Sequence, residues 1–239
     1  MLYAIGDLHL SLGLAKKKPM DIFGGLWAEH DKKIKKYWTE TVGESDTVLI
    51  PGDVSWAMNN AEFAVDAAFI HALPGKKIII SGNHDYWWNS TAQLNALYPD
   101  LFFMKNTFFR YEENGRICHV CGSRGWVCPN DANFTQHDLK IYNREVLRLG
   151  LSLDSAMADG AEEIIVMMHY PPFNDKKESS DFVGTLKKYP VSTVVYGHLH
   201  GASTRQAVCE AREGIDYWLV SADFINFAPF RLVLSENGA

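Results

Sequence analysis

The feature that most limits what this chain can fold into is a set of short apolar segments, each followed at once by polar side chains. Runs of about five residues rich in Ile, Val and Leu are typical of buried strands. The segments are Leu2–Ile5, Thr47–Ile50, Lys77–Ile80, Ile164–Met168 and Thr193–Tyr196. Between several of them, apolar residues recur at helical spacing, in Trp27–Val42, Ala61–Leu73 and Gln136–Leu153. Strands that alternate with helices in this way predict an α/β protein.

Two further regions predict additional strands. Leu101–Cys121 contains apolar and aromatic runs with a turn at Asn114-Gly115, and we expect a hairpin there. Arg205–Leu234 is also strand-like, with a turn near Glu213-Gly214, which suggests a second sheet. The chain contains no repeat or linker-like tract, and its 239 residues suit one core. We therefore expect a single domain over residues 1–239.

Composition narrows the functional classes. The formal net charge is −6, so the chain has no general attraction to nucleic acid or to an anionic membrane. It has no run of about 18 apolar residues, which a membrane-spanning helix would need. The N-terminus lacks the basic leading region of a signal peptide. We therefore expect a cytoplasmic protein that acts on a small substrate, and its oligomeric state stays open.

The cysteines do not suggest a disulfide framework. Cys118 and Cys121 form a single C-x-x-C motif inside a segment that we expect to be a strand. Residues three apart on a strand point to opposite faces, which disfavours a shared zinc ion or a redox pair. Buried free thiols are the favoured interpretation.

Residues of the types that bind metal ions follow all of the apolar segments. The carboxyl ends of parallel neighbouring strands lie at one edge of a sheet, so we expect these side chains to converge. Glycine stands beside most of them and allows sharp turns and close approach to a small ion. In chain order, the segments are followed by Asp7 and His9, by Asp53, by Asn83, His84 and Asp85, by His169, and by His198 and His200.

The chemistry of these side chains indicates which ions they bind. Carboxylate, amide and imidazole ligands without thiolate suit Mn, Fe, Zn, Co or Ni. The imidazoles are too numerous for a typical Ca²⁺ or Mg²⁺ site, and the set is too large for one tetrahedral zinc ion. We therefore expect two divalent ions, with Mn²⁺ favoured, that share a bridging carboxylate and keep positions open for water and substrate.

Each motif has an ordinary explanation when it is taken alone. A polar turn explains Asp7 and His9, an Asx-capped turn explains Asn83, and a surface pair explains His198 and His200. Chance does not easily explain the joint pattern, because five of the nine histidines directly follow strands. The remaining histidines lack this context and are expected to be structural or solvated: His30, His71, His119 and His137.

At these residues the chain resembles the calcineurin-like metallophosphoesterase superfamily, and its small bacterial members most closely. The pattern of that family is Asp-x-His, Gly-Asp, Gly-Asn-His-Asp/Glu, a later His and Gly-His-x-His. Every element occurs here in the same order, from Asp7 to His200. The resemblance implies an α/β fold with four layers, a β-sandwich of two sheets flanked by helices on both sides.

The resemblance also assigns the ligands. One metal ion would be bound by three residues, the other ion by three more, and one carboxylate would bridge the two ions. The first set is Asp7, His9 and His200, the second set is Asn83, His169 and His198, and the bridge is Asp53.

The implied activity is that of a binuclear metal-dependent phosphoesterase. It would hydrolyse phosphodiester or phosphomonoester bonds with a metal-activated hydroxide. His84 would face the substrate and act as the catalytic general acid. Two alternatives remain open, a nuclease acting on DNA or RNA and a non-catalytic metal-binding scaffold.

Side chains beside the motifs are candidates for contact with substrate or for support. We expect Arg124 and Trp87 among the substrate contacts, although a structural ion pair and core packing are the respective alternatives. Asp85 is expected to make supporting hydrogen bonds, and Asp223 to support a ligand. The aromatic residues that could stack on a base or sugar are Trp56, Tyr86, Trp87 and Trp88.

Overall fold

The strands of the computed structural model form two sheets, and residues 1–16, 18 and 20–234 are described. The first sheet is parallel except at one edge, where its last strand pairs antiparallel to its first. In spatial order it consists of β11 (Phe230–Leu232), β1 (Leu2–Ala4), β2 (Thr47–Pro51), β3 (Lys76–Ile80) and β4 (Leu101–Phe103).

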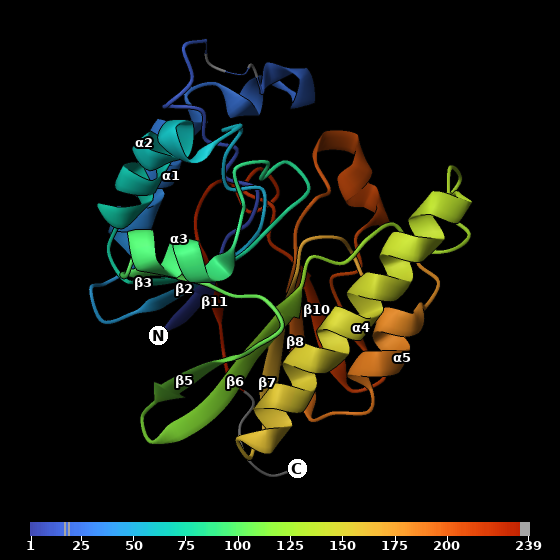
Figure 1. Ribbon diagram of the computed structural model, residues 1–239. Coiled ribbons are helices and arrows are strands. Elements are labelled where there is room, and N and C mark those ends of the chain that lie inside the picture. Colours follow the sequence, from blue (N-terminus) through green and yellow to red (C-terminus); the bar gives the residue numbers. More distant parts are fainter. Residues whose placement is uncertain (17, 19, 235–239) are drawn as a thin grey trace.

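The second sheet is parallel at its centre and antiparallel at both edges. In spatial order it consists of β5 (Phe109–Glu113), β6 (Arg116–Ser123), β7 (Ile164–Met168), β8 (Val191–Tyr196), β10 (Ile215–Leu219) and β9 (Ala211–Arg212). The carboxyl ends of the central strands of both sheets point to the same end of the molecule (Figure 1).

Helices cover the outer face of each sheet (Figure 1). The helices α1 (His30–Thr41), α2 (Asn60–His71) and α3 (Thr91–Leu97) pack on the first sheet, and α4 (Gln136–Ala158) and α5 (Asp181–Leu186) pack on the second. Short 3-10 helices lie at Asp21–Phe23 (η1), Gly25–Trp27 (η2) and Gly201–Gln206 (η3). None of the helices in the described ranges has both the length and the apolar character that crossing a membrane requires.

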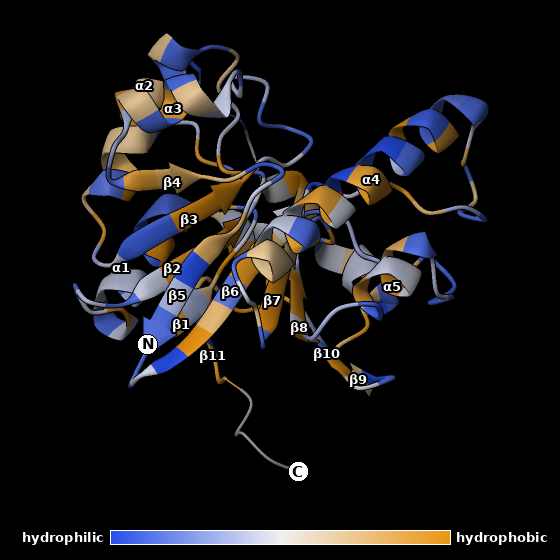
Figure 2. Cartoon of the chain, turned by 60° about the horizontal axis from the view of Figure 1, so that its bottom comes forward, coloured by the Kyte–Doolittle hydropathy of each residue, from blue (hydrophilic) through white to orange (hydrophobic). Residues whose placement is uncertain are grey.

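Alternation along the strands explains why the layers form. In β1, Leu2 and Ala4 point to the interior between the sheets, whereas Tyr3 points to the helices. In β7, Ile165 and Met167 point to the interior. The alternate residues Ile164, Val166 and Met168 point to α4 and α5. Side chains that alternate along a strand bury both faces of each sheet, so the strands are mostly apolar, whereas the helices carry a mixture of polar and apolar residues (Figure 2). The four-layer architecture implied by the resemblance is confirmed.

The helix predictions are confirmed with shifted ends. The helix expected over Trp27–Val42 begins at His30, because Glu29 has a left-handed φ of 52° and Trp27 lies in η2. Helix α4 extends beyond the expected end to Ala158. It begins with a capping box in which Thr135 and Asp138 bond each other's backbone N–H.

Two strand predictions need correction. The predicted hairpin over Leu101–Cys121 forms only between β5 and β6, while Leu101–Phe103 pairs in parallel with β3 in the other sheet. The predicted strand region from Arg205 begins with η3, and its strands start at Ala211. The first error concerns the pairing partner, because a strand pattern states which faces are buried but not which strand lies alongside. The second error concerns where the strands begin.

The C-x-x-C prediction is confirmed. Cys118 faces the interior between the sheets, Cys121 faces α4, and both thiols are free and buried.

Candidate metal centre

The motif residues come from the ends of strands in both sheets. Asp7, Asp53 and Asn83 follow β1, β2 and β3 of the first sheet, and His169 and His198 follow β7 and β8 of the second. We expected neighbouring parallel strands of one sheet edge to bring these residues together. In the structure, the edges of two sheets bring them together instead. Backbone hydrogen bonds join the two sheets at this edge, from the N–H of Gly6 to the carbonyl of Val220 at 2.8 Å.

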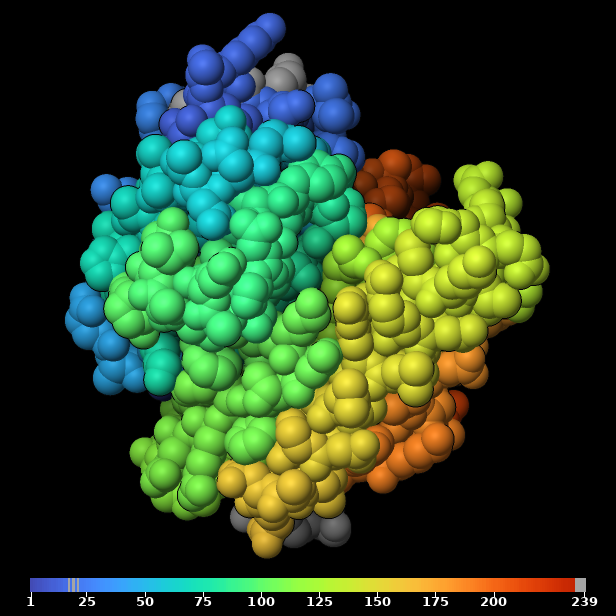
Figure 3. All heavy atoms as spheres, viewed as in Figure 1, coloured from blue at the N-terminus to red at the C-terminus, as the bar shows by residue number. Residues whose placement is uncertain are grey.

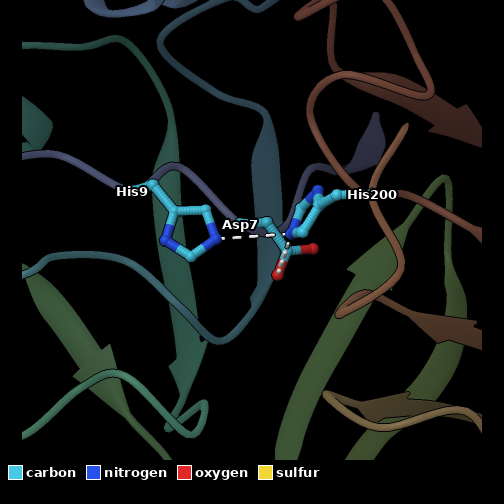
Figure 4. Close-up of side chains that lie close together, drawn as sticks. All are labelled: Asp7, His9 and His200. Atoms are coloured by element: carbon cyan, nitrogen blue, oxygen red, sulfur yellow. Dashed lines mark hydrogen bonds and ion pairs between the residues drawn. The ribbon is translucent and has the colours of Figure 1, made fainter. Parts of the chain in front are cut away.

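Three ligand-type side chains gather at the end of β1. The His9 and His200 rings point at each other, with their Nε2 atoms 3.3 Å apart (Figure 4). The Asp7 carboxylate lies beside them, with Oδ1 3.5 Å from Nε2 of His200. These residues are the set that the resemblance assigned to one metal ion, and the fold places all three in contact.

The second group gathers around Asp53. Nε2 of His169 lies 2.7 Å from Oδ1 of Asn83 and 3.5 Å from Oδ2 of Asp53. The same Oδ2 lies 3.8 Å from Nε2 of His9, so Asp53 stands between the two groups. The ring of His198 lies 5.1 Å from that of His169, centroid to centroid. The structure therefore brings all the predicted ligands to one site.

The backbone at this site is strained. Asp7, His9, Asp53 and His198 have positive φ angles of 57°, 45°, 51° and 73°. Non-glycine residues seldom adopt this region, and such strain is typical of functional sites. The turns aim these side chains into the space between the sheets.

Glycine is required where carboxylates pack against the backbone. A Cβ atom at Gly197 would lie 2.4 Å from a carboxylate oxygen of Asp7, and one at Gly82 would lie 2.1 Å from that of Asp53. No larger residue fits at these positions unless the carboxylates move.

Hydrogen bonds at the outer nitrogens orient two of the rings. Nδ1 of His200 donates to Oδ1 of Asp223 at 2.9 Å, and Nδ1 of His169 donates to the carbonyl of Pro51 at 3.1 Å. Asp223 thus contacts the His200 ring, which is where a residue that supports a ligand would lie. The His169 ring is neutral, so donation from Nδ1 leaves a lone pair at Nε2, which is the atom that faces the site.

These atoms fit metal ions better than they fit one another. Nε2 of His169 faces two oxygen atoms, the amide oxygen of Asn83 and a carboxylate oxygen of Asp53, and neither Nε2 of the neutral ring nor the amide oxygen carries a proton. Such acceptors repel one another unless a cation lies between them. The donor set of nitrogen and oxygen atoms without sulfur suits a borderline divalent ion.

Burial keeps most of the imidazoles neutral. It lowers the pKa of His169 to about 3 and that of His198 to about 4, and it holds the pKa of His9 well below its usual value. Metal ions bind neutral imidazole, so these rings need not lose a proton first.

Neighbouring carboxylates raise the pKa values of His200 and Asp53. Burial alone would lower the pKa of His200, but the carboxylates of Asp7 and Asp223 raise it to about 10. Burial and then the nearby Asp85 and Asp7 carboxylates raise the pKa of Asp53 well above its usual value. Buried carboxylates this close destabilise one another, and a bound cation would relieve that repulsion.

His84 lies at the mouth of the site and is half-buried. Its ring packs against Trp56, with centroids 4.3 Å apart and the planes tilted by 42°, and its backbone N–H donates to Oδ1 of Asp53 at 2.8 Å. Trp56 also stacks on His9, at 5.1 Å, and the exposed Tyr86 ring lies 6.1 Å from His84. A cavity of about 180 Å³ in front of these rings is also lined by Asp53, His198 and His200.

The prediction that Trp87 contacts substrate is wrong. Trp87 is 0% exposed and stacks on Phe63, with ring centroids 3.4 Å apart, in the core beneath α2. Its indole N–H donates to Asp85, whose carboxylate also accepts from the backbone of Gly82 and Val54. Asp85 thus has the supporting role that we expected, and it ties the motif segment to the loop after β2.

Arg124 forms the structural contacts that were its alternative. Its guanidinium lies 3.7 Å from Glu145 and 4.7 Å from the ring centre of Trp126. The Arg124 carbonyl accepts from the backbone N–H of His169 at 3.1 Å, so the residue still borders the site.

Several residues that support the site gave no sequence signal. Trp27 packs edge-on against His9 and His200, and Tyr170 lies against His198. His30 lies 3.2 Å from the carbonyl of His9, which fits its expected structural role. Only Tyr170, directly after His169, stood close enough to a motif to be found.

Comparisons with known proteins found a matching family and several similar chains. The sequence model of the calcineurin-like phosphoesterase family matches residues 2–202. The Gene 66 protein of Mycobacterium phage D29 is 23% identical over 198 residues, which cover 80% of this chain and 79% of that protein. Similar solved structures include a protein of unknown function from Aquifex aeolicus, with 14% identity, a TM-score of 0.46 and coverage of 96% and 94% of the two chains. Another is a 5'-nucleotidase precursor from Thermus thermophilus, with 15% identity, a TM-score of 0.45 and coverage of 82% and 41%. Since the family match spans most of the sequence, this chain belongs to the calcineurin-like phosphoesterase family.

Proposed function

We propose that this chain is a hydrolase that uses two divalent metal ions, with Mn²⁺ favoured, to split phosphodiester or phosphomonoester bonds of a small substrate. The observation that supports this proposal is the convergence of carboxylate, amide and imidazole groups at the common edge of two sheets. The residues that would hold the ions are Asp7, His9, Asp53, Asn83, His169, His198 and His200. When bound, such ions neutralise phosphate charge and supply a nucleophile from water at neutral pH.

The protein's own groups orient the ligands and move a proton. Asp223 and the Pro51 carbonyl fix the rings of His200 and His169, so the ligand geometry exists before substrate arrives. His84 would give its proton to the leaving oxygen, because it lines the cavity directly in front of the ligands. Burial lowers the pKa of His84, and an incoming anionic phosphate would oppose that shift by favouring the charged ring.

A second cavity beside the metal centre suits the organic part of a substrate. It has a volume of about 460 Å³, and His198 forms part of its wall. Aromatic walls with a few polar groups are typical of sites for small organic ligands. This cavity, together with the net charge of −6, favours a small phosphoester over a nucleic acid. The aromatic residues of its wall are Trp126, Phe134, Tyr170 and Phe173.

The direct test is hydrolysis of a diester and a monoester of p-nitrophenol by protein loaded with Mn²⁺. We expect metal-dependent turnover, with two ions per chain by elemental analysis. A chain that binds two ions but hydrolyses neither ester, also with Fe²⁺ or Zn²⁺, would be a metal-binding scaffold instead. Cleavage of oligonucleotides that declines steeply with salt would support the nuclease alternative.

The general-acid role of His84 is tested with His84→Ala. We expect the turnover rate to fall by about 10²–10⁴-fold, with a larger loss for poor leaving groups than for p-nitrophenol. His137→Ala on the exposed face of α4 is the matched control and should leave the rate unchanged. An equal loss with good and poor leaving groups would contradict a role in proton donation.

A further inference from the structure

A cavity of about 240 Å³ lies next to the segment that carries Asn83 and His84. One wall consists of Ser81, Gly82 and Asp85 from that segment, and the opposite wall consists of the end of β6 and one side of α4. His84 itself lines the metal-centre cavity instead. The surface in Figure 3 shows the same arrangement, with the green part of the chain after β3 against the yellow helix α4. One stretch of backbone therefore borders both cavities.

The walls of this cavity carry an excess of positive charge. Two carboxylates, of Asp85 and Glu145, also line it. The Asp85 carboxylate already accepts hydrogen bonds from backbone N–H groups and from the Trp87 indole. The cationic residues of the wall are Lys105, Arg124, Arg144 and Arg148.

The single negative charge of Glu145 does not balance the three guanidinium groups around it. Its carboxylate is 1% exposed and lies 2.5 Å from Arg148, 3.5 Å from Arg144 and 3.7 Å from Arg124. One carboxylate neutralises one guanidinium and accepts few of their N–H groups, because each guanidinium carries five.

The donors that remain point to a missing acceptor. Nε of Arg124 is buried and has no hydrogen-bond partner within the described part of the chain. Burial lowers the pKa of Lys105, and the nearby Arg148 lowers it further against the opposing effect of Glu145. The first observation shows a donor that lacks an acceptor, and the second shows positive charge at Lys105 that the nearby carboxylate does not offset.

We propose that this cavity binds a phosphate-type oxyanion at a site separate from the metal centre. Guanidinium groups match two oxygen atoms of such an anion at once, and Lys105 adds a point charge. The anion is either free inorganic phosphate or a second phosphoryl group of a larger ligand. This site goes beyond the proposed function, which does not require it.

One residue of the cavity wall also contacts the metal centre. Gly82 lines this cavity and packs directly against the Asp53 carboxylate. An anion bound there therefore contacts the segment that positions Asn83 and His84.

The test is calorimetric titration of the metal-loaded protein with orthophosphate and with pyrophosphate. We expect one binding event at the metal centre and a second event that the double substitution Arg144→Gln with Arg148→Gln weakens at least about tenfold. The matched control is Lys140→Gln with Lys188→Gln, which removes two exposed charges that do not line the cavity and should change neither event. Since Arg148 pairs with buried Glu145, Lys105→Gln serves as a second variant at an exposed position and should weaken the same event.

The two sources of the anion give different results. Weakened orthophosphate binding identifies free phosphate as the ligand, and weakening confined to pyrophosphate identifies a second phosphoryl group. The proposal is overturned if the wild type shows only the event that Asp53→Asn removes, or if the control pair weakens the second event equally. Hydrolysis is not the readout, so failure of the proposed activity would leave this result unaffected.

Discussion

The space between the two sheets and the edge where their strands end both bury most of their side chains, but they are built in opposite ways. In the interior, Leu49 and Ile78 of the first sheet pack against Ile165 and Met167 of the second. At the edge, carboxylates and imidazoles from the residues that directly follow these strands meet, and Asp7 is as buried as Ile78.

This difference shows which region stabilises the fold and which region depends on a ligand. Burying apolar side chains contributes about 25 cal/mol per Å², whereas strained backbone costs about 1–3 kcal/mol per residue. The edge contains four non-glycine residues with positive φ, among them Asp7 and Asp53, whose carboxylates are also buried. We therefore expect substitutions at the edge to change function and metal affinity, and substitutions in the interior to change stability.

The largest effect is expected for Asp53→Asn. Loss of the bridging carboxylate should lower activity by more than the roughly 10²–10³-fold that follows from removal of one stabilising donor. In the presence of a chelator, the thermal stability should stay equal or rise at neutral pH. The reason is that burial and neighbouring carboxylates raise the pKa of Asp53, so its charged form destabilises the metal-free fold. Steady-state rates and thermal unfolding test this. A marked fall in the thermal stability of the metal-free variant would contradict the difference between edge and interior.

An interior substitution should show the reverse behaviour. Ile165→Ala removes buried methyl groups from the space between the sheets and should lower the free energy of unfolding by about 2–5 kcal/mol. The milder Ile165→Val should cost about 0.5–1.5 kcal/mol. Denaturant titrations measure the loss, and the turnover number per folded molecule should not change. A lowered turnover number would mean that interior packing also sets the ligand geometry.

A smaller effect on metal affinity is expected for Asp223, which contacts His200 but does not itself face the metal centre. Asp223→Asn keeps the shape of the side chain but removes the charge that orients His200, so metal affinity or activity should fall by about 10–100-fold. Asp216→Asn, at an exposed position of β10, is the control. Metal titrations measure the affinity, and equal losses in both variants would show that only the overall charge matters.

The smallest effect concerns the thiols. Burial raises the pKa of Cys121 and Cys128 to about 12 and raises that of Cys118 as well, so all three stay protonated at neutral pH. A thiol reagent at pH 7.5 should therefore label the native protein at Cys209 alone, which is half-buried. In denaturant, all four thiols should react. Labelling of Cys118 in the native protein would show that the interior opens more readily than its packing suggests.

The sequence was sufficient to find most of the strands and the polar residues that the fold brings together at their ends. Short continuous apolar runs identified segments such as Ile164–Met168, and polar residues directly after them marked the site. Short-range features carry this information, because a strand end and its glycine turn depend on neighbouring residues.

Contacts between distant segments depended on the tertiary structure. It placed Leu101–Phe103 beside β3, buried Trp87 against Phe63, and set Arg124 against Glu145. An amphipathic pattern states that a face is buried but does not name the residue that covers it. The sequence by itself therefore determined which groups can bind metal ions, and only the packing of two sheets decided how those groups meet and which cations remain beside them without an acceptor.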